Sequence, residues 1–137
     1  MTGARAMIGS EAVVLIVDDE PDICWALSQI LEGSGIVSLT ATSGQEALGL
    51  ARRQRFRLAF IDAKLPDVEW RELARLIRET NPRIPIVLVS GYFYGDDPEV
   101  LHACTEGVIS DFLSKPFLLE EVRTIAQRAL ASRLEDL

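Results

Sequence analysis

Short runs rich in apolar and β-branched residues alternate with segments of helical periodicity along the whole chain, and this alternation constrains the fold more than any other feature. Strands are predicted at 12–17, 37–40, 58–61, 86–89 and 111–114. The runs before Asp18, Asp62 and Ser90 are apolar at nearly every position, as expected of parallel strands that helices cover on both faces. The pattern is typical of βαβ units and predicts an α/β fold with a five-stranded parallel sheet.

Capping and stop signals place helices between these strands. The first helix is predicted to start near Asp19, with Pro21 in its first turn, and to end at Gly33. Ser43 and Glu46 have the spacing of a capping box and mark the start of the second helix. The other three helices are predicted over 68–79, 98–107 and 118–132.

Length and composition agree with one independently folding domain. With 137 residues, of which 48% are hydrophobic and 26% charged, the chain can bury a core without disulfide or metal support. We expect the domain to cover residues 11–132, after a flexible tail at 1–10 and before a C-terminal tail or the start of a linker at 133–137. Cys24 and Cys104 lack the spacing of a zinc or redox motif, so both are expected to be ordinary thiols.

Charge and hydropathy exclude several classes of partner. A formal net charge of -7 repels phosphate backbones, so no direct nucleic-acid binding by this chain is expected. The longest apolar run, 12–17, is too short to span a membrane, and residues 1–10 lack the apolar segment of a signal peptide. We therefore expect a cytoplasmic protein with no membrane partner.

Ionisable or hydroxyl side chains stand at the ends of four of the predicted strands. Asp18 and Asp19 follow the first strand, and Asp62 follows the third. Ser90 follows the fourth strand and Lys115 the fifth. Because ligands of open parallel sheets bind at the carboxyl ends of the strands, we expect these residues to converge on one crevice.

Such a crevice would have the composition of a phosphoryl-transfer site. Three carboxylates held together raise one another's pKa unless a cation lies between them, and an all-oxygen set suits a hard ion such as Mg²⁺. Ser90 can offer a hydroxyl hydrogen bond, and Lys115 an ammonium, to an anion above the metal. A carboxylate can serve as the nucleophile by forming an acyl phosphate.

From Val14 to about Leu130 the sequence resembles the receiver domains of response regulators, the CheY-like superfamily of two-component signalling. The resemblance rests on four motifs in order, which are Val-Asp-Asp-Glu-Pro at 17–21, Asp62 with Leu-Pro at 65–66, Val-Ser-Gly at 89–91 and Lys-Pro-Phe at 115–117. It implies a doubly wound, flavodoxin-like sheet of order 2-1-3-4-5 flanked by five helices. It also implies a cis peptide bond between Lys115 and Pro116.

Carried onto this sequence, the resemblance implies that Asp62 accepts a phosphoryl group. Asp19, Asp62 and the backbone carbonyl of Lys64 would bind Mg²⁺ or Mn²⁺ directly, and Asp18 would act mainly through metal-bound water. The donor would be a phosphohistidine on a sensor histidine kinase or a phosphotransfer protein. The chain would catalyse only its own phosphorylation and dephosphorylation, so we do not expect an enzyme.

The resemblance further implies a conformational switch. Ser90 and Lys115 would hold the phosphoryl oxygens, and Ser90 would move toward them once the aspartyl phosphate forms. Phe112 would then rotate inward and change the surface of the fourth helix and fifth strand. The output domain or protein that reads this surface stays unknown at this point, and a homodimer is left open.

Two departures from the family pattern keep alternatives open. Trp70 stands where family members usually have Gly, and the segment between Ser90 and Lys115 is longer than usual. A pseudo-receiver, which binds partners without being phosphorylated, would accommodate both departures. A haloacid-dehalogenase-like phosphatase also uses an aspartyl nucleophile and Mg²⁺, but its two acids are separated by one residue, whereas Asp18 and Asp19 are adjacent.

Overall fold

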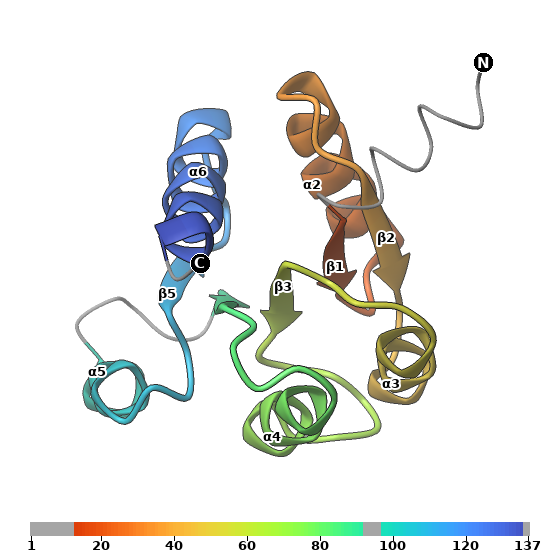
Figure 1. Ribbon diagram of the computed structural model, residues 1–137, viewed down its shortest axis with the longest axis vertical. Helices are drawn as coiled ribbons and strands as arrows, with labels where there is room; N and C mark the ends of the chain where they lie inside the picture. Colours follow the sequence, from red (N-terminus) through yellow and green to blue (C-terminus); the bar gives the residue numbers. More distant parts are fainter. Residues whose placement is uncertain (1–12, 92–96, 136–137) are drawn as a thin grey trace.

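The computed structural model describes residues 13–91 and 97–135, and within these ranges five strands alternate with five helices. The elements are β1 (Val14–Val17), α2 (Pro21–Gly33), β2 (Ser38–Ala41), α3 (Gly44–Arg53), β3 (Leu58–Asp62), α4 (Trp70–Thr80), β4 (Ile86–Ser90), α5 (Pro98–Thr105), β5 (Asp111–Ser114) and α6 (Leu119–Glu135). The predicted α/β alternation is confirmed (Figure 1).

The strands form one parallel sheet in the order β2-β1-β3-β4-β5, as expected. The chain winds outward from β1 to β2 and then returns past β1 to β3, so the direction of winding reverses between β1 and β3. Val17 at the end of β1 pairs with Ala41 and with Ile61. The carboxyl ends of β1 and β3 therefore lie side by side at the point where such sheets bind ligands.

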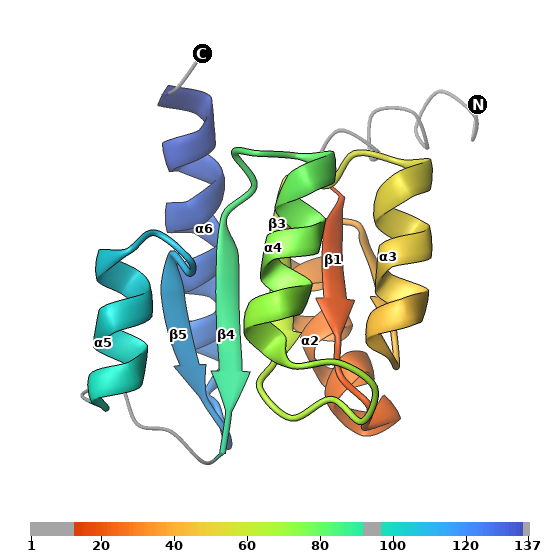
Figure 2. The same ribbon diagram turned by 90° about the horizontal axis from the view of Figure 1, so that it is seen from below.

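Helices cover both faces of the sheet. Figure 1 shows α2 and α6 on one face and α3, α4 and α5 on the other. In Figure 2, α3, α4 and α5 lie in front of the sheet. Alternate residues of β1, β3 and β4 enter two separate cores, so Leu15 packs under α3 and α4 while Ile16 packs under α2 and α6. Burial on both faces explains why β1, β3 and β4 are apolar at almost every position.

Several element bounds differ slightly from those predicted. The first helix begins at Pro21 rather than near Asp19, because Glu20 is in extended conformation and serves as the N-cap residue. The last helix extends beyond the predicted end at Ser132, up to Glu135. The expected tail at 1–10 lies outside the described residues, as do residues 136–137.

The predicted helix over 68–79 had Trp70 inside it, whereas in the structure Trp70 is the first residue of α4. Its side chain is 3% exposed and belongs to the core under α3 and α4. In the described part of the chain no residue other than glycine has a positive φ, so the loop before Trp70 is built without a left-handed conformation. The aromatic segment that follows Gly91 lies outside the described residues.

The peptide bond between Lys115 and Pro116 is cis, as the resemblance implied. Among the helices of the described ranges, none has the length and apolar character needed to cross a membrane.

Candidate functional site

Three carboxylates meet at the carboxyl ends of β1 and β3. Asp18 and Asp19 follow β1, Asp62 ends β3, and one oxygen from each lies within 4.8 Å of the others. Asp18 and Asp62 are buried, at 1% and 4% exposure, whereas Asp19 is exposed at the mouth. The structure thus brings together the three acids that the sequence predicted to converge.

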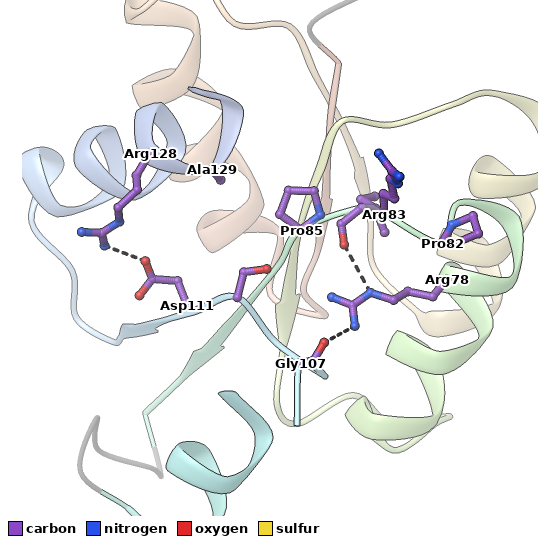
Figure 3. Close-up of a pocket in the computed structure, with 10 residues that line it drawn as sticks. Arg78, Pro82, Arg83, Pro85, Gly107, Asp111, Arg128 and Ala129 are labelled. Atoms are coloured by element: carbon purple, nitrogen blue, oxygen red, sulfur yellow. Dashed lines mark hydrogen bonds and ion pairs between the residues drawn. The ribbon is translucent and has the colours of Figure 1, made fainter. Parts of the chain in front are cut away.

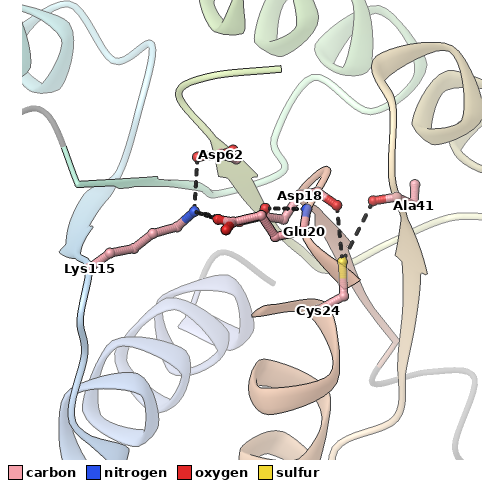
Figure 4. A network of polar contacts seen from close by, with 6 residues as sticks. All are labelled: Asp18, Glu20, Cys24, Ala41, Asp62 and Lys115. Atoms are coloured by element: carbon pink, nitrogen blue, oxygen red, sulfur yellow. Dashed lines mark hydrogen bonds and ion pairs between the residues drawn. The ribbon is translucent and has the colours of Figure 1, made fainter. Parts of the chain in front are cut away.

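Lys115 reaches into the same site from the end of β5 (Figure 4). Its Nζ lies 2.9 Å from Oδ2 of Asp18 and 3.4 Å from Oδ1 of Asp62. Glu20, which is not one of the three clustered acids, places its Oε1 3.2 Å from the same nitrogen. One ammonium group is therefore shared by three carboxylates.

Burial and like charges perturb the ionisation of this site. Burial, with a further contribution from the negative charge of Asp18, raises the pKa of Asp62 to about 6, although Lys115 partly offsets the effect. Burial likewise raises the pKa of Asp18. Burial alone would lower the pKa of Lys115, but the hydrogen bond and charges of the neighbouring carboxylates raise it above its ordinary value. One ammonium thus does not compensate the buried acids fully, and a second cation would be stabilised here.

Backbone and thiol groups hold Asp18 in place. Its Oδ1 accepts a hydrogen bond from the backbone N–H of Glu20 at 2.9 Å. The Cys24 thiol donates to the backbone oxygen of Asp18 at 3.3 Å, and burial with the charge of Asp18 raises the pKa of this thiol to about 11. Cys24 is therefore a buried thiol whose environment favours the protonated form.

Two contacts of the site were missed in the sequence. Glu20 belongs to the acidic motif at 17–21, yet its contact with Lys115 joins residues far apart in the chain. Nothing in the sequence indicated the contact between the Cys24 thiol and Asp18, apart from the position of Cys24 on the buried face of α2. Both depend on how α2 leaves β1, which the periodicity of the sequence does not fix.

Of the remaining predicted residues, Lys64 lies at the hollow above the acids, whereas Ser90 and Phe112 do not line it. This open hollow is lined by Asp19, Glu20, Asp62, Lys64, Leu65, Pro66, Gly91 and Lys115. Ser90 ends β4, is buried, and is not among these lining residues, although its backbone oxygen accepts a hydrogen bond from the backbone N–H of Lys115 at 2.9 Å. Phe112 lies on β5 and packs, half-buried, against the core that α3 and α4 cover.

The donor set fits a hard divalent cation. The site supplies carboxylate oxygens from Asp18, Asp19 and Asp62, and such ions prefer oxygen ligands. The exposed position of Asp19 leaves the cluster open to the hollow rather than enclosed by protein. The residues present therefore suit Mg²⁺ or Mn²⁺ with room for a further ligand.

A second hollow lies at the opposite end of the sheet, where α4 and α5 end (Figure 3). Arg78 donates to the backbone oxygens of Ile84, at 3.2 Å, and Gly107, and Arg128 pairs with Asp111 at 2.6 Å. These arginines satisfy carbonyl and carboxylate groups of the fold. None of the predicted site residues lines this hollow.

Comparison with known proteins identifies a family and several relatives. The chain matches the family model described as "Response regulator receiver domain" over residues 14–127. It is 34% identical over 129 residues to the probable transcriptional regulatory protein TcrX of Mycobacterium tuberculosis, an alignment that covers 94% of this chain and 53% of TcrX. It is 35% identical over 119 residues to the nitrogen assimilation regulatory protein NtrX of Azorhizobium caulinodans, covering 85% of this chain and 26% of NtrX. The chain thus spans about half of TcrX and about a quarter of NtrX.

Solved structures agree with this result. A CheY-like response regulator receiver domain protein from Methanospirillum hungatei superposes with a TM-score of 0.82 at 26% identity, covering 91% of this chain and 98% of that one. The chemotaxis protein CheY4 of Vibrio cholerae gives a TM-score of 0.78 at 29% identity, with 87% and 98% covered.

Proposed function

This chain belongs to the response regulator receiver domain family, and from that premise we propose that it is a phosphoacceptor switch whose acceptor is Asp62. The observation that carries the proposal is the placement of the Asp62 carboxylate. It ends β3 at the floor of an open hollow, close to two further acids and 3.4 Å from the Lys115 ammonium. A nucleophile, a cation site and a fixed positive charge are thus held together on rigid strand ends.

The proposed step transfers a phosphoryl group from a phosphohistidine to Asp62. A carboxylate oxygen of Asp62 attacks phosphorus, the phosphorus–nitrogen bond of the donor breaks, and the imidazole nitrogen keeps the electron pair and takes a proton from water. The donor is a sensor histidine kinase or a phosphotransfer protein. The chain supplies the nucleophile and the charge that stabilises the transferring group, which is the main requirement of phosphoryl transfer.

Asp19, Asp62 and the backbone carbonyl of Lys64 would hold Mg²⁺ or Mn²⁺, with Asp18 acting through water. The bound ion would neutralise phosphoryl oxygens and lower the pKa of the buried acids, so that Asp62 is ionised as a nucleophile must be. Lys115 would exchange its present carboxylate partners for phosphoryl oxygens. Ser90, which pairs with Ser114 in the sheet and accepts the backbone N–H of Lys115, would add a hydroxyl hydrogen bond.

The output of the switch is proposed to lie on α5 and β5, the fourth helix and fifth strand. Phe112 is only half-buried, so it can become more buried if movement of Ser90 toward the phosphoryl group vacates space beside it. TcrX and NtrX are longer than this chain, and we propose that an output domain or protein responds to the altered surface. Coupling would be reciprocal, so a partner that prefers the switched surface would also favour phosphorylation.

Metal binding should be visible as stabilisation. At a Mg²⁺ concentration of ten times the dissociation constant, linkage raises the melting temperature by about 5 °C for a domain of this size. Asp19→Asn should remove most of this shift because it deletes an exposed ligand without disturbing the core. Asp22→Asn, an exposed acid in the first turn of α2 and outside the cluster, is the matched control. Equal Mg²⁺ shifts in both variants would place the ion elsewhere.

The proposed function is tested by intact mass after incubation with acetyl phosphate. We expect one phosphoryl group to be gained with Mg²⁺ and none with a chelator. No gain despite Mg²⁺ binding would favour a pseudo-receiver. Turnover of a chromogenic phosphate ester would favour a haloacid-dehalogenase-like phosphatase.

A further inference from the structure

The loop between β3 and α4, residues 63–69, carries Lys64 and is attached to a helix far from it in sequence. Oδ1 of Asp67 accepts the backbone N–H of Gly44 at 2.9 Å, and Oδ2 accepts that of Gln45 at 3.0 Å. Gly44 and Gln45 are the first two residues of α3. Both oxygens of one carboxylate are therefore bound to N–H groups that an isolated helix would leave without partners.

Close packing accompanies these hydrogen bonds. A Cβ atom on Gly44 would lie 2.2 Å from Cγ1 of Val68 and 3.3 Å from its Cβ. The loop thus approaches α3 more closely than any side chain at position 44 would allow. The base of the loop is closed separately by an antiparallel bridge between Lys64 and Glu69.

The first residues of this loop touch the phosphoacceptor itself. The backbone N–H of Lys64 is hydrogen-bonded to the Asp62 carboxylate, and Lys64, Leu65 and Pro66 line the hollow above it. Displacement of the loop would therefore move groups that contact Asp62. Attachment at Asp67 limits that displacement.

We infer that Asp67 is a positioning residue for the proposed phosphoryl transfer, holding the loop so that Lys64 meets the metal and Asp62 correctly. The inference rests on the proposed function and adds a residue to it. Trp70 is compatible with this loop because no residue from 63 to 70 has a positive φ.

Asp67→Ala should weaken Mg²⁺ binding about tenfold, the lower end of the effect of removing groups that orient metal ligands. The rate of phosphoryl uptake at subsaturating Mg²⁺ should fall by a similar factor. Asp67→Asn keeps one acceptor oxygen, so its Mg²⁺ affinity and its rate of phosphoryl uptake should lie between those of Asp67→Ala and wild type. Mg²⁺ affinity is measured by titration calorimetry, and uptake from acetyl phosphate by intact mass.

Ser43→Ala is the matched control. Ser43 caps the same helix end by accepting the backbone N–H of Glu46 at 3.1 Å, so its removal weakens α3 without releasing the loop. Weaker Mg²⁺ binding in Asp67→Ala, but not in Ser43→Ala, supports positioning. The inference is overturned if both variants bind Mg²⁺ as tightly as wild type does. It is also overturned if both lose the same amount of Mg²⁺ affinity.

A second pair of variants tests the close approach. Gly44→Ala should weaken Mg²⁺ binding by pushing Val68 and the loop outward, and Val68→Ala in the same chain should restore much of it. The failure of the inference can be distinguished from the failure of the proposed function. If the wild-type protein takes up no phosphoryl group, the proposed function is refuted. Normal uptake and Mg²⁺ affinity in Asp67→Ala would instead refute only the inference about Asp67.

Discussion

Asp62→Asn is expected to stabilise the metal-free protein at neutral pH. The folded protein raises the pKa of Asp62 from 3.8 to about 6, first through burial and then through the charge of Asp18. Between these two values the folded state binds more protons than the unfolded state, so stability falls as pH rises. At 1.36 kcal/mol per pKa unit, the ionised carboxylate costs at most about 3 kcal/mol above pH 7. The asparagine variant avoids this cost.

Urea unfolding in the presence of a chelator measures the effect. The difference in the free energy of unfolding between Asp62→Asn and wild type should be small at pH 4 and grow until about pH 7. Asp22→Asn, which removes an exposed acid, should show no such growth. A difference that is independent of pH, or that favours wild type at neutral pH, would contradict the raised pKa.

Lys115→Met is expected to destabilise the metal-free protein at neutral pH by about 3 kcal/mol, the lower end of the cost of removing one partner of a buried pair. The Lys115 ammonium lies 2.9 Å from Asp18 and 3.4 Å from Asp62, and methionine keeps the apolar stem but not the ammonium. The loss should shrink at pH 5, where the acids take up protons. Mg²⁺ should also reduce it, because the ion supplies the missing charge.

Lys64→Met is the control for Lys115→Met. It removes the same charge from an exposed side chain that lines the same hollow. Urea unfolding at pH 7.5 and pH 5, with and without Mg²⁺, compares the two variants. Equal losses of stability would show that net charge, and not contact with the buried acids, controls the effect.

The sequence predicted the general fold because buried parallel strands are recognisable by composition. Runs such as 86–89 are apolar at every position, and the helices between strands carry capping signals that the structure reproduces at Ser43. The order of the strands did not follow from these patterns and came from the resemblance. Periodicity defines which face of an element is buried, but not which strand becomes its neighbour.

The main site was predictable for a related reason. Asp62 and Lys115 stand at the carboxyl ends of strands, and a parallel sheet necessarily places those ends on one edge. The contacts of Glu20 and Asp67 were not predicted, because each joins a loop to a distant element. Loop paths depend on local packing, such as that of Val68 against Gly44, for which one sequence gives no periodic signal.

The most direct test of the central claim is to locate the phosphoryl group. After incubation with acetyl phosphate and Mg²⁺, borohydride reduction converts an aspartyl phosphate into homoserine, and tryptic peptides are then analysed by mass spectrometry. Cleavage after Arg57 and Lys64 releases a peptide in which Asp62 is the single acidic side chain. We predict homoserine in that peptide and none in the peptide that contains Asp18 and Asp19. Modification of Asp18 or Asp19, or an unmodified 58–64 peptide from protein that has gained a phosphoryl group, would contradict the assignment of Asp62.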